Sequence, residues 1–382
     1  MQSNLEEQFV RDDLNLHIYS QALLSNLAVL KGLCKETTKV CAVVKANAYG
    51  HGQREVVSIL KDAQVDFFGV ANVYEALFIS DLVESQNILI FEPIHSAFSP
   101  ELIKSCAEKN FHFAATCPEL LEKISEVLAS LGGVLNLHVK VETGMGRCGV
   151  RPEQAQNLIK IIDKSKNLHL AGVYTHLATS DEQDLSFANE QLARFTDFLD
   201  ANKLNKRQDI IIHAANSGGA VNLPHSHFDM IRPGIALYGY VSADFAQKQI
   251  LKPVCSLDTS IVQMNKFSKG QTIGYGRSFQ VKRDTIGAVI PIGYADGYRR
   301  LFSNKTVMKV ADSFCPLIGR ISMDKCVIDV TDVADIAVGQ PVTVIDDSHS
   351  SPCSVYALAK LAGTICNDIL TSISPRAKRI IH

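Results

Sequence analysis

Short β-branched runs alternate with amphipathic segments through roughly the first 240 residues, and this alternation constrains the fold more than any other feature. The segments between most of the runs have helical periodicity, as in REVVSILKDA and PEQAQNLIKIIDK. Eight strands that alternate with helices over such a length are typical of a (β/α)8 barrel. The predicted strands cover residues 40–46, 67–73, 87–92, 111–116, 135–142, 169–177, 210–216 and 228–233.

The alternation stops near residue 250, where strand-like runs separated by turn residues take over. Only SVYALAKLAG (354–363) has a helical pattern in this part of the chain. We therefore predict a mainly β second domain, with residues 1–245 in the barrel and residues 246–382 in the second domain. The segment LNLHIY (14–19) precedes the first barrel helix and is a candidate to pair with this second domain. The predicted strands of the second domain lie within residues 257–267, 285–293, 305–312 and 341–346.

Composition excludes several classes of partner. A formal net charge of −2 gives no reason to expect nucleic acid or an anionic membrane as a partner. No run of 18 apolar residues predicts a transmembrane helix, and the opening MQSNLEEQFVRDD lacks the pattern of a signal peptide. The ten cysteines are scattered without a CxxC pair, so we expect a reduced, cytoplasmic protein with no metal site.

Two lysines occupy positions where a barrel interior is normally apolar. In the run LNLHVKVE (135–142), alternation places Lys140 on a polar face that should point into the barrel. In VCAVVKA (40–46), Lys45 shares a face with Cys41 and Val43. Both lysines come late in their strands, at the C-terminal mouth where barrel enzymes do their chemistry. A buried amine needs a partner or a changed charge, whereas a rim lysine would extend its amine to water. The polar face of 135–142 comprises Asn136, His138, Lys140 and Glu142.

The loops after the last two predicted strands have the composition of a phosphate site. AANSGGAV (214–221) offers Asn216, Ser217 and two glycines, and IRPGIAL (231–237) offers Gly234 and Ile235. Glycine lets the backbone approach an anion, although ordinary turns have the same composition. A lysine and a phosphate site at one mouth suggest an imine with a phosphorylated aldehyde, for which pyridoxal phosphate is the fitting cofactor.

Eight motifs in order give the sequence a strong resemblance to bacterial alanine racemases, the pyridoxal-phosphate barrel enzymes. The resemblance covers essentially the whole chain. It implies an enzyme that racemises alanine with two bases and supplies D-alanine for peptidoglycan. It also implies a homodimer with shared active sites. The motifs are AVVKANAYGHG, VKVETGMGRCGV, GVYTHLATSD, HAANSGG, MIRPGIALYG, IGYGRSF, IPIGYADGY and IGRISMD.

The resemblance also implies a role for individual residues around the cofactor. Lys45 would hold pyridoxal 5'-phosphate covalently and act as one base. Arg232 would face the pyridine nitrogen as a hydrogen-bond donor that keeps its own proton. His176 would stack on the pyridine ring, and Arg147 would contact the phenolic oxygen. The residues expected around the phosphate are Tyr49, Asn216, Ser217, Gly234 and Ile235.

Further roles concern the substrate. Tyr275 would be the second base and Met323 a substrate contact, both supplied by the other subunit. Arg147 would bind the substrate carboxylate, with Lys140 carbamylated beside it, and Tyr294 would line the pocket. Two bases on opposite faces suit racemisation, because a proton leaves one face of Cα and another returns to the opposite face.

One departure from the family pattern bears on specificity. The family normally has a tyrosine followed by a glutamate near the C-terminus, where this chain has GTICNDIL, with Asn367 at the tyrosine position and Asp368 at the glutamate. The smaller amide opens volume and resembles the serine-racemising relatives, so a serine or mixed serine/alanine racemase is an alternative. A pyridoxal-phosphate decarboxylase, which would release carbon dioxide, and a non-catalytic cofactor carrier, which has no use for a second base, are further alternatives.

Overall fold

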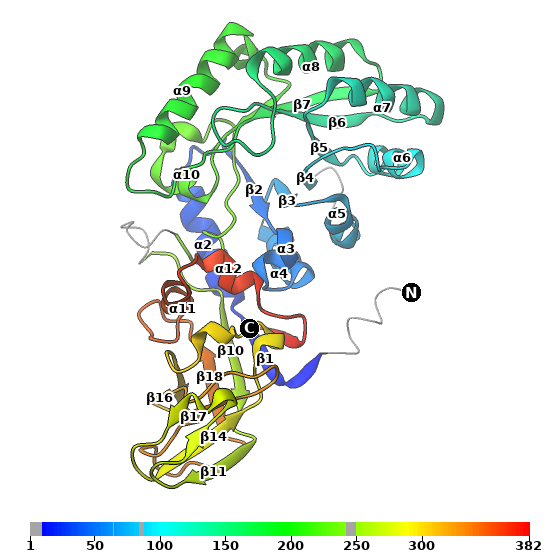
Figure 1. Cartoon of the computed structure of the whole chain (residues 1–382). Helices are drawn as coiled ribbons and strands as arrows, with labels where there is room; N and C mark the ends of the chain where they lie inside the picture. The colour runs from blue at the N-terminus through cyan, green and yellow to red at the C-terminus, as the bar shows by residue number, and fades with distance from the viewer. Residues whose placement is uncertain (1–9, 64, 84–87, 242–249) are drawn as a thin grey trace.

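The computed structural model describes residues 10–63, 65–83, 88–241 and 250–382. The barrel occupies the upper half of Figure 1 and the second domain the lower half, with α11 and α12 between them. The predicted boundary at residues 245 and 246 lies outside the described residues. No helix of the described residues is long and apolar enough to cross a membrane.

The barrel predicted from the alternation is confirmed. Eight strands form one sheet in the order β8-β7-β6-β5-β4-β3-β2-β9, and every paired neighbour is parallel. Backbone hydrogen bonds from Asp229 to Ile212 (2.9 Å) and from Arg232 to Ala215 (2.9 Å) join the two ends of the sheet. The strands are β2 (Lys39–Val43), β3 (Phe67–Val70), β4 (Ile88–Pro93), β5 (His112–Ala115), β6 (Leu135–Lys140), β7 (Leu168–Tyr174), β8 (Ile211–His213) and β9 (Met230–Ile231).

The barrel helices begin at local signals in the sequence. Asn72 caps α5 by accepting the backbone N–H of Glu75, and Ser99 caps α6 directly before a proline at the first helical position. Their buried stripes pack on the outer face of the sheet, whose residues are almost all inaccessible to solvent. The helices are α2 (Ser20–Gly32), α3 (Lys45–Tyr49), α4 (Gln53–Leu60), α5 (Val73–Ile79), α6 (Pro100–Glu108), α7 (Pro118–Leu131), α8 (Pro152–Lys164), α9 (Ser186–Ala201) and α10 (Ser217–Asn222).

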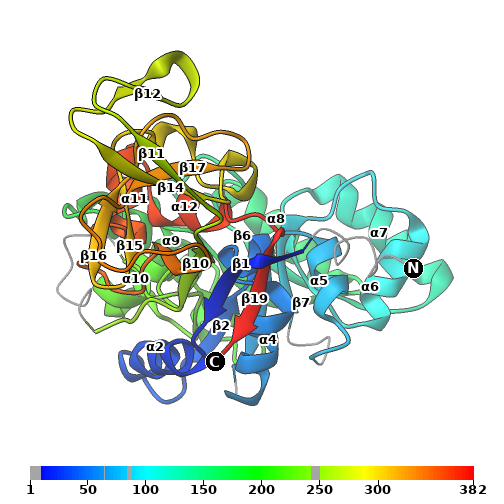
Figure 2. The same cartoon turned by 90° about the horizontal axis from the view of Figure 1, so that it is seen from below.

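The second domain is mainly β and receives a strand from the N-terminal region of the chain. The candidate strand is β1 (Arg11–Ile18), which pairs antiparallel with β10 and parallel with β19. Figure 2 shows β1 and β19 side by side, near the centre of the view from below. The main sheet has the order β16-β15-β18-β10-β1-β19. The remaining strands are β10 (Cys255–Ser260), β11 (Gln263–Phe267), β12 (Thr272–Ile273), β13 (Phe279–Gln280), β14 (Thr285–Ile290), β15 (Val307–Val310), β16 (Ser313–Pro316), β17 (Cys326–Asp329), β18 (Pro341–Ile345) and β19 (Ala377–Ile381).

Two helices, rather than the one predicted, connect the second domain to the barrel. The helical pattern at 354–363 gives α11 (Val355–Ala362), which Ser354 caps. The prediction missed α12 (Cys366–Thr371), because six residues are too few to show helical periodicity. Close packing explains its position, since a Cβ on Gly50 would lie only 2.1 Å from the carbonyl oxygen of Leu370.

Candidate active site

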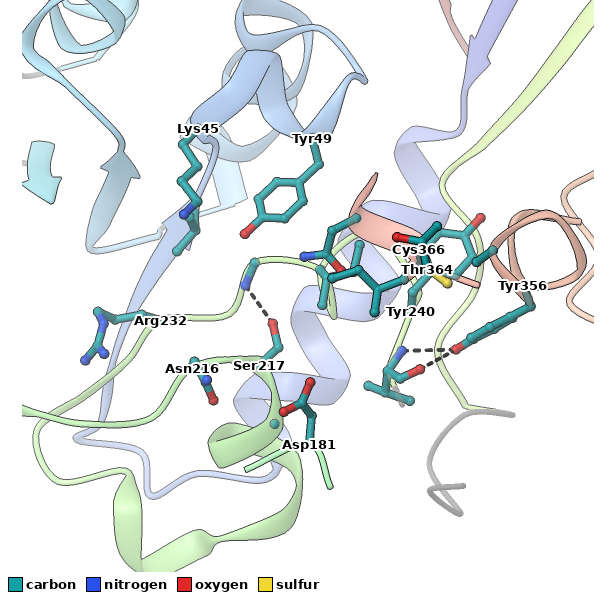
Figure 3. A pocket seen from close by; sticks show the side chains of 18 of the residues that line it. Lys45, Tyr49, Asp181, Asn216, Ser217, Arg232, Tyr240, Tyr356, Thr364 and Cys366 are labelled. Carbon is teal, nitrogen blue, oxygen red and sulfur yellow. Dashed lines mark hydrogen bonds between the residues drawn. The ribbon is translucent and has the colours of Figure 1, made fainter. Parts of the chain in front are cut away.

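A cavity of about 840 Å³ lies between the barrel mouth and the helices α11 and α12. Figure 3 shows the side chains of Lys45 and Tyr49 entering it from one side, with Arg232, Asn216 and Ser217 opposite. The structure thus brings most of the predicted site residues together. Those that line the cavity are Lys45, Tyr49, Lys140, Arg147, His176, Asn216, Ser217, Arg232, Gly234, Ile235 and Asn367.

Lys45 follows a strand that is shorter than predicted. β2 ends at Val43, and Ala46, Asn47, Ala48 and Tyr49 all have φ near +53°, in the left-handed region. Each such residue costs about 1–2 kcal/mol, because its Cβ crowds the following carbonyl. The strand prediction over 40–46 was therefore wrong at its end, although Lys45 does lie at the barrel mouth.

Several hydrogen bonds hold this left-handed turn in place. The Glu75 carboxylate accepts backbone N–H groups from Ala46 (2.9 Å) and Ala71 (2.7 Å), which ties the turn to the loop after β3. Asn47 Oδ1 accepts the backbone N–H of Gln53 at 2.7 Å. Arg379 of β19 donates to the carbonyl of Gly50 at 2.9 Å, so the second domain also contacts the turn. The backbone next to Lys45 is thus fixed by its surroundings despite its strain.

The environment of Lys45 favours a neutral amine. Burial lowers the pKa of the Lys45 amine, and the nearby Arg147 cation lowers this pKa further. The Glu75 carboxylate acts in the opposite direction. A neutral amine is the form that attacks a carbonyl carbon or accepts a proton, so this environment suits both roles expected of Lys45.

Lys140 lies inside the barrel, but Glu142 does not pair with it. Burial lowers the pKa of Lys140 to about 8. Its Nζ lies 5.5 Å from the centre of the Tyr174 ring. Glu142 leaves the predicted inward face, because β6 ends at Lys140 and the carboxylate accepts N–H groups from Gly144 (2.6 Å) and Gly146 (3.0 Å). Among the described residues, no carboxylate lies within ion-pair distance of Lys140.

The two loops expected to hold a phosphate meet through Ser217. Its Oγ accepts the backbone N–H groups of Gly234 (2.9 Å) and Ala236 (3.2 Å). A Cβ on Gly234 would lie 2.2 Å from the hydroxyl oxygen of Tyr49, so only glycine permits this approach. Hydroxyls and backbone N–H groups converging on one cavity suit a phosphate group.

Asn216 has a structural function in the same loop. Its Oδ1 accepts from the backbone N–H of Gly219 (2.9 Å) and from the Ser180 hydroxyl (2.6 Å), which caps α10. Its Nδ2 donates to the carbonyl of Leu177 at 3.2 Å. Asn216 therefore fixes the position of the neighbouring Ser217.

Arg232 is a buried cation held by neutral acceptors. It is 3% exposed and donates to the carbonyls of Thr175 (2.9 Å) and Ala214 (3.0 Å) and to Nδ1 of His213 (2.7 Å). Its Nη2 also lies 3.4 Å from Nδ1 of His176. Burial lowers the pKa of Arg232 to about 10, which still leaves the guanidinium protonated at neutral pH.

Sequence reasoning missed two side chains in this region. His213 contacts Arg232 directly, and the only signal for it was a histidine at the end of the strand run IIIH. The ring of Tyr174 stacks on that of His213, with centroids 4.8 Å apart and planes 5° apart. The Tyr174 hydroxyl is buried in the cavity wall and has no hydrogen-bond partner among the described residues.

Three predicted site residues lie away from the cavity. Tyr275, Met323 and Tyr294 belong to the second domain and are 72%, 54% and 45% exposed. None of them is among the residues that line the cavity of Lys45.

Comparison with known proteins identifies the family. A model of the alanine racemase N-terminal domain matches residues 18–242, and a model of the C-terminal domain matches residues 254–381. Alanine racemase 2 of Caldanaerobacter subterraneus subsp. tengcongensis is 36% identical over 365 residues, which cover 94% of this chain and 92% of the relative.

Solved structures agree with these matches. An alanine racemase from Clostridium difficile 630 is 29% identical with a TM-score of 0.88, over 98% of this chain and 96% of that one. An alanine racemase from Bacillus anthracis with bound L-Ala-P is 28% identical with a TM-score of 0.87, over 97% and 95% of the two chains. The family matches span both domains, and we conclude that this chain belongs to the alanine racemase family.

Proposed function

We propose that this protein interconverts L-alanine and D-alanine with pyridoxal 5'-phosphate as its cofactor and two catalytic bases. The observation that carries the proposal is the convergence of Lys45, the Ser217–Gly234 loops and Arg232 on one cavity in a chain of this family. Relatives named alanine racemase favour alanine over the alternatives of serine racemisation and decarboxylation. D-Alanine is a precursor of peptidoglycan, so we assign the activity to the cytoplasm and to cell-wall synthesis.

The residues present fit this cofactor. Ser217 and Tyr49 would hold the phosphate through their hydroxyls. Gly234 and Ile235 would hold it through their backbone N–H groups, with the Gly234 N–H exchanging its present acceptor, Ser217 Oγ, for a phosphate oxygen. Lys45, with a pKa lowered by burial, would provide the amine that binds the aldehyde. When bound, pyridoxal phosphate would withdraw electrons from the bond between the substrate Cα and its hydrogen.

The side chains around the cofactor would orient it and moderate its chemistry. His176 would lie against the ring, and Arg232 would donate an N–H to the pyridine nitrogen. Because the pKa of Arg232 remains about 10, the guanidinium would keep its proton. A pyridine nitrogen that only accepts a hydrogen bond is a weaker electron acceptor, which would favour rapid return of the proton to Cα over side reactions such as transamination.

Two bases would exchange the Cα proton on opposite faces. Lys45 Nζ would act on one face, and the hydroxyl of Tyr275 would act on the other. Because Tyr275 is 72% exposed and outside the cavity of its own chain, we assign it to the site of the second subunit of a homodimer. Met323 would accompany it and contact the substrate. Arg147 would bind the substrate carboxylate, and a carbamate on Lys140 would pair with Arg147.

A racemisation assay against each L-amino acid, analysed by chiral chromatography, tests the activity. We expect D-alanine to form fastest, without release of carbon dioxide. Borohydride reduction of the yellow protein should fix the cofactor to Lys45, as located by peptide mapping. Attachment to another lysine would contradict the assignment of Lys45, and carbon dioxide release would indicate a decarboxylase.

A further inference from the structure

Three histidines form a chain of hydrogen bonds behind Arg232, through the interior of the barrel. Nδ1 of His213 accepts from Arg232 at 2.7 Å. Nε2 of His213 lies 2.9 Å from Nδ1 of His138, and Nε2 of His138 lies 3.0 Å from Nδ1 of His112. His138 and His213 are fully buried, so the chain connects the cavity wall to the start of β5 without intervening solvent.

The backbone of β7 leaves room for the hydrogen bond between His138 and His213. His138 lies on β6 and His213 on β8, so their contact must cross β7. The residue of β7 opposite His138 is Gly172, and a Cβ there would lie 2.3 Å from Nδ1 of His138. The register between β6 and β7 shifts directly before this pair, since Leu137 pairs with Leu170 and His138 with Gly172. The additional residue of β7 between these two pairs thus places Gly172, which has no side chain, where the imidazole of His138 reaches across β7.

The chain has one direction of hydrogen bonding, which Arg232 imposes. A guanidinium is a donor only, so Nδ1 of His213 must be the acceptor and carry no proton. His213 then holds its proton on Nε2 and donates to Nδ1 of His138. His138 in turn holds its proton on Nε2 and donates to Nδ1 of His112. Both buried imidazoles are therefore neutral and in the same tautomer.

Burial supports the neutral state independently. Desolvation lowers the pKa of His138 and of His213 well below the ordinary value. The other groups that lower these values are Arg232 and the remaining histidines, and none of them is an acid. The opposite tautomer would set two donors against each other at the Arg232 contact, and a buried unsatisfied donor is expensive.

We propose that His213 and His138 are positioning residues that orient Arg232 through a directional chain of neutral imidazoles. The proposal rests on the proposed function in one respect, namely that Arg232 faces the pyridine nitrogen. Nη1 of Arg232 donates to His213, and the two hydrogens of Nη2 serve Thr175 and Ala214, with Nδ1 of His176 a further 3.4 Å contact of Nη2. These contacts fix the guanidinium plane, so the two donors that remain are held in a set direction in the cavity wall.

The first test needs neither cofactor nor activity. Neutron diffraction from deuterium-exchanged apoenzyme should show deuterium on Nε2 and none on Nδ1 of both His213 and His138. Deuterium on Nδ1 of either residue would overturn the directional chain. This result is independent of whether the protein racemises alanine, so a failure of the chain and a failure of the proposed function give different observations.

The second test separates orientation from simple packing through a matched pair. In His213→Asn the amide oxygen can occupy the position of Nδ1 and still accept from Arg232, whereas in His213→Gln the amide lies nearer the position of Nε2. We expect kcat to fall about 10- to 100-fold in His213→Gln and only a few-fold in His213→Asn, with KM within about threefold of the parent enzyme. The absorption band of the bound cofactor should shift in His213→Gln alone. Equal loss in both variants would reject a positioning role.

A third variant disturbs the chain from a distance. Gly172→Ala places a methyl group 2.3 Å from Nδ1 of His138 and 2.6 Å from the backbone carbonyl oxygen of Ile211 on β8, at a position that does not line the cavity. We expect a loss of kcat between those of the two His213 variants, with the same direction of band shift as in His213→Gln. His227→Asn is the control, because His227 is buried but bonds to the carbonyl of Ala220 outside the chain. A band shift in His227→Asn equal to that in Gly172→Ala would show a general effect of core disturbance and overturn the proposal.

Discussion

The barrel mouth and the exposed surface of the second domain differ in how far their predicted site residues are buried and held by contacts within the chain. At the mouth, Arg232 is 3% exposed and each contact of its guanidinium is fixed. On the second domain, Tyr275 and Met323 are more than half exposed and contact no part of the cavity. The cavity that would hold the cofactor is thus formed within one chain, whereas the residue proposed as the second base lies outside it. The difference is what the proposed homodimer with shared sites requires, because there a second subunit would supply Tyr275.

Subunit mixing tests this difference with the largest expected effect. Lys45→Ala and Tyr275→Phe should each lower kcat by about 10²- to 10⁴-fold, because each substitution removes one of the two proposed bases. If the site is shared, mixing the two inactive proteins should restore about a quarter of the parent activity, since half of the dimers are mixed and each has one intact site.

The mixing experiment needs proof of subunit exchange, which differently tagged chains and native mass spectrometry provide. Lys45→Ala mixed with a tagged copy of itself is the control and should stay inactive. Absence of rescue despite proven exchange would place both bases in one chain and remove the distinction between the two regions.

Lys140 offers a smaller effect confined to the barrel mouth. Its pKa of about 8 provides neutral amine near neutral pH, which can attack carbon dioxide to form a carbamate anion with release of a proton. If a carbamate on Lys140 pairs with Arg147 as proposed, Lys140→Ala should raise KM for alanine about 10- to 100-fold, with partial rescue by acetate. Depletion of carbon dioxide should lower the activity of the parent enzyme and leave Lys140→Ala unchanged. Labelling the parent protein with ¹³CO₂ should give a carbamate signal in its NMR spectrum. The absence of that signal would contradict the assignment.

Acid sensitivity should be a property of the barrel interior. His138 and His213 have pKa values well below 6.5 when folded, so below pH 6.5 the unfolded chain binds protons that the folded chain does not. Stability is therefore fully present above pH 6.5 and falls with acid, by about 1.4 kcal/mol per histidine for each pH unit. Urea unfolding at pH 7.5 and 5.5 should show a smaller pH effect in His213→Asn. The exposed His225→Asn is the control and should keep the parent dependence.

Substitution of Asn367 should have the smallest effect on activity. Asn367 belongs to the part of the second domain that reaches the cavity. Its amide lies on α12 and lines the cavity. Alanine should be the better substrate, with measurable racemisation of L-serine. Asn367→Tyr should lower kcat/KM for serine relative to alanine by a few-fold to about tenfold, which is the size of one neutral hydrogen bond. An unchanged ratio would leave Asn367 as a neighbour of the phosphate only.

The barrel was predictable because its signal is repeated eight times, and each strand run was found within a few residues of its true position. The ends of elements were less predictable, and β2 shows why. The sequence AVVKANAYG does not predict that four consecutive non-glycine residues, 46–49, adopt φ near +53°. That conformation is held by Glu75 and by the packing of α12 against Gly50, and both Glu75 and α12 lie far from the turn in sequence.

The candidate site was predictable from motifs to the extent that its residues belong to loops at the strand ends. Strand alternation and loop position placed Lys45 and Ser217 at one barrel mouth, and the family resemblance added Arg232 to the same site. It did not reveal the link between His138 and His213, because that link depends on a register shift and on the missing side chain of Gly172. A periodic pattern states which face a residue occupies but not which residue two strands away it contacts.

The position of β1 has a consequence for how the protein is made. Leu16 of β1 pairs with Leu257 on one side and with Arg379 on the other, so both neighbours are synthesised more than 200 residues later. Its fully buried side chains Leu14, Leu16 and Ile18 therefore stay without their native cover on the ribosome while the whole barrel emerges. β1 is therefore synthesised before the barrel strands but completes its pairing only after β10 and β19 have been made.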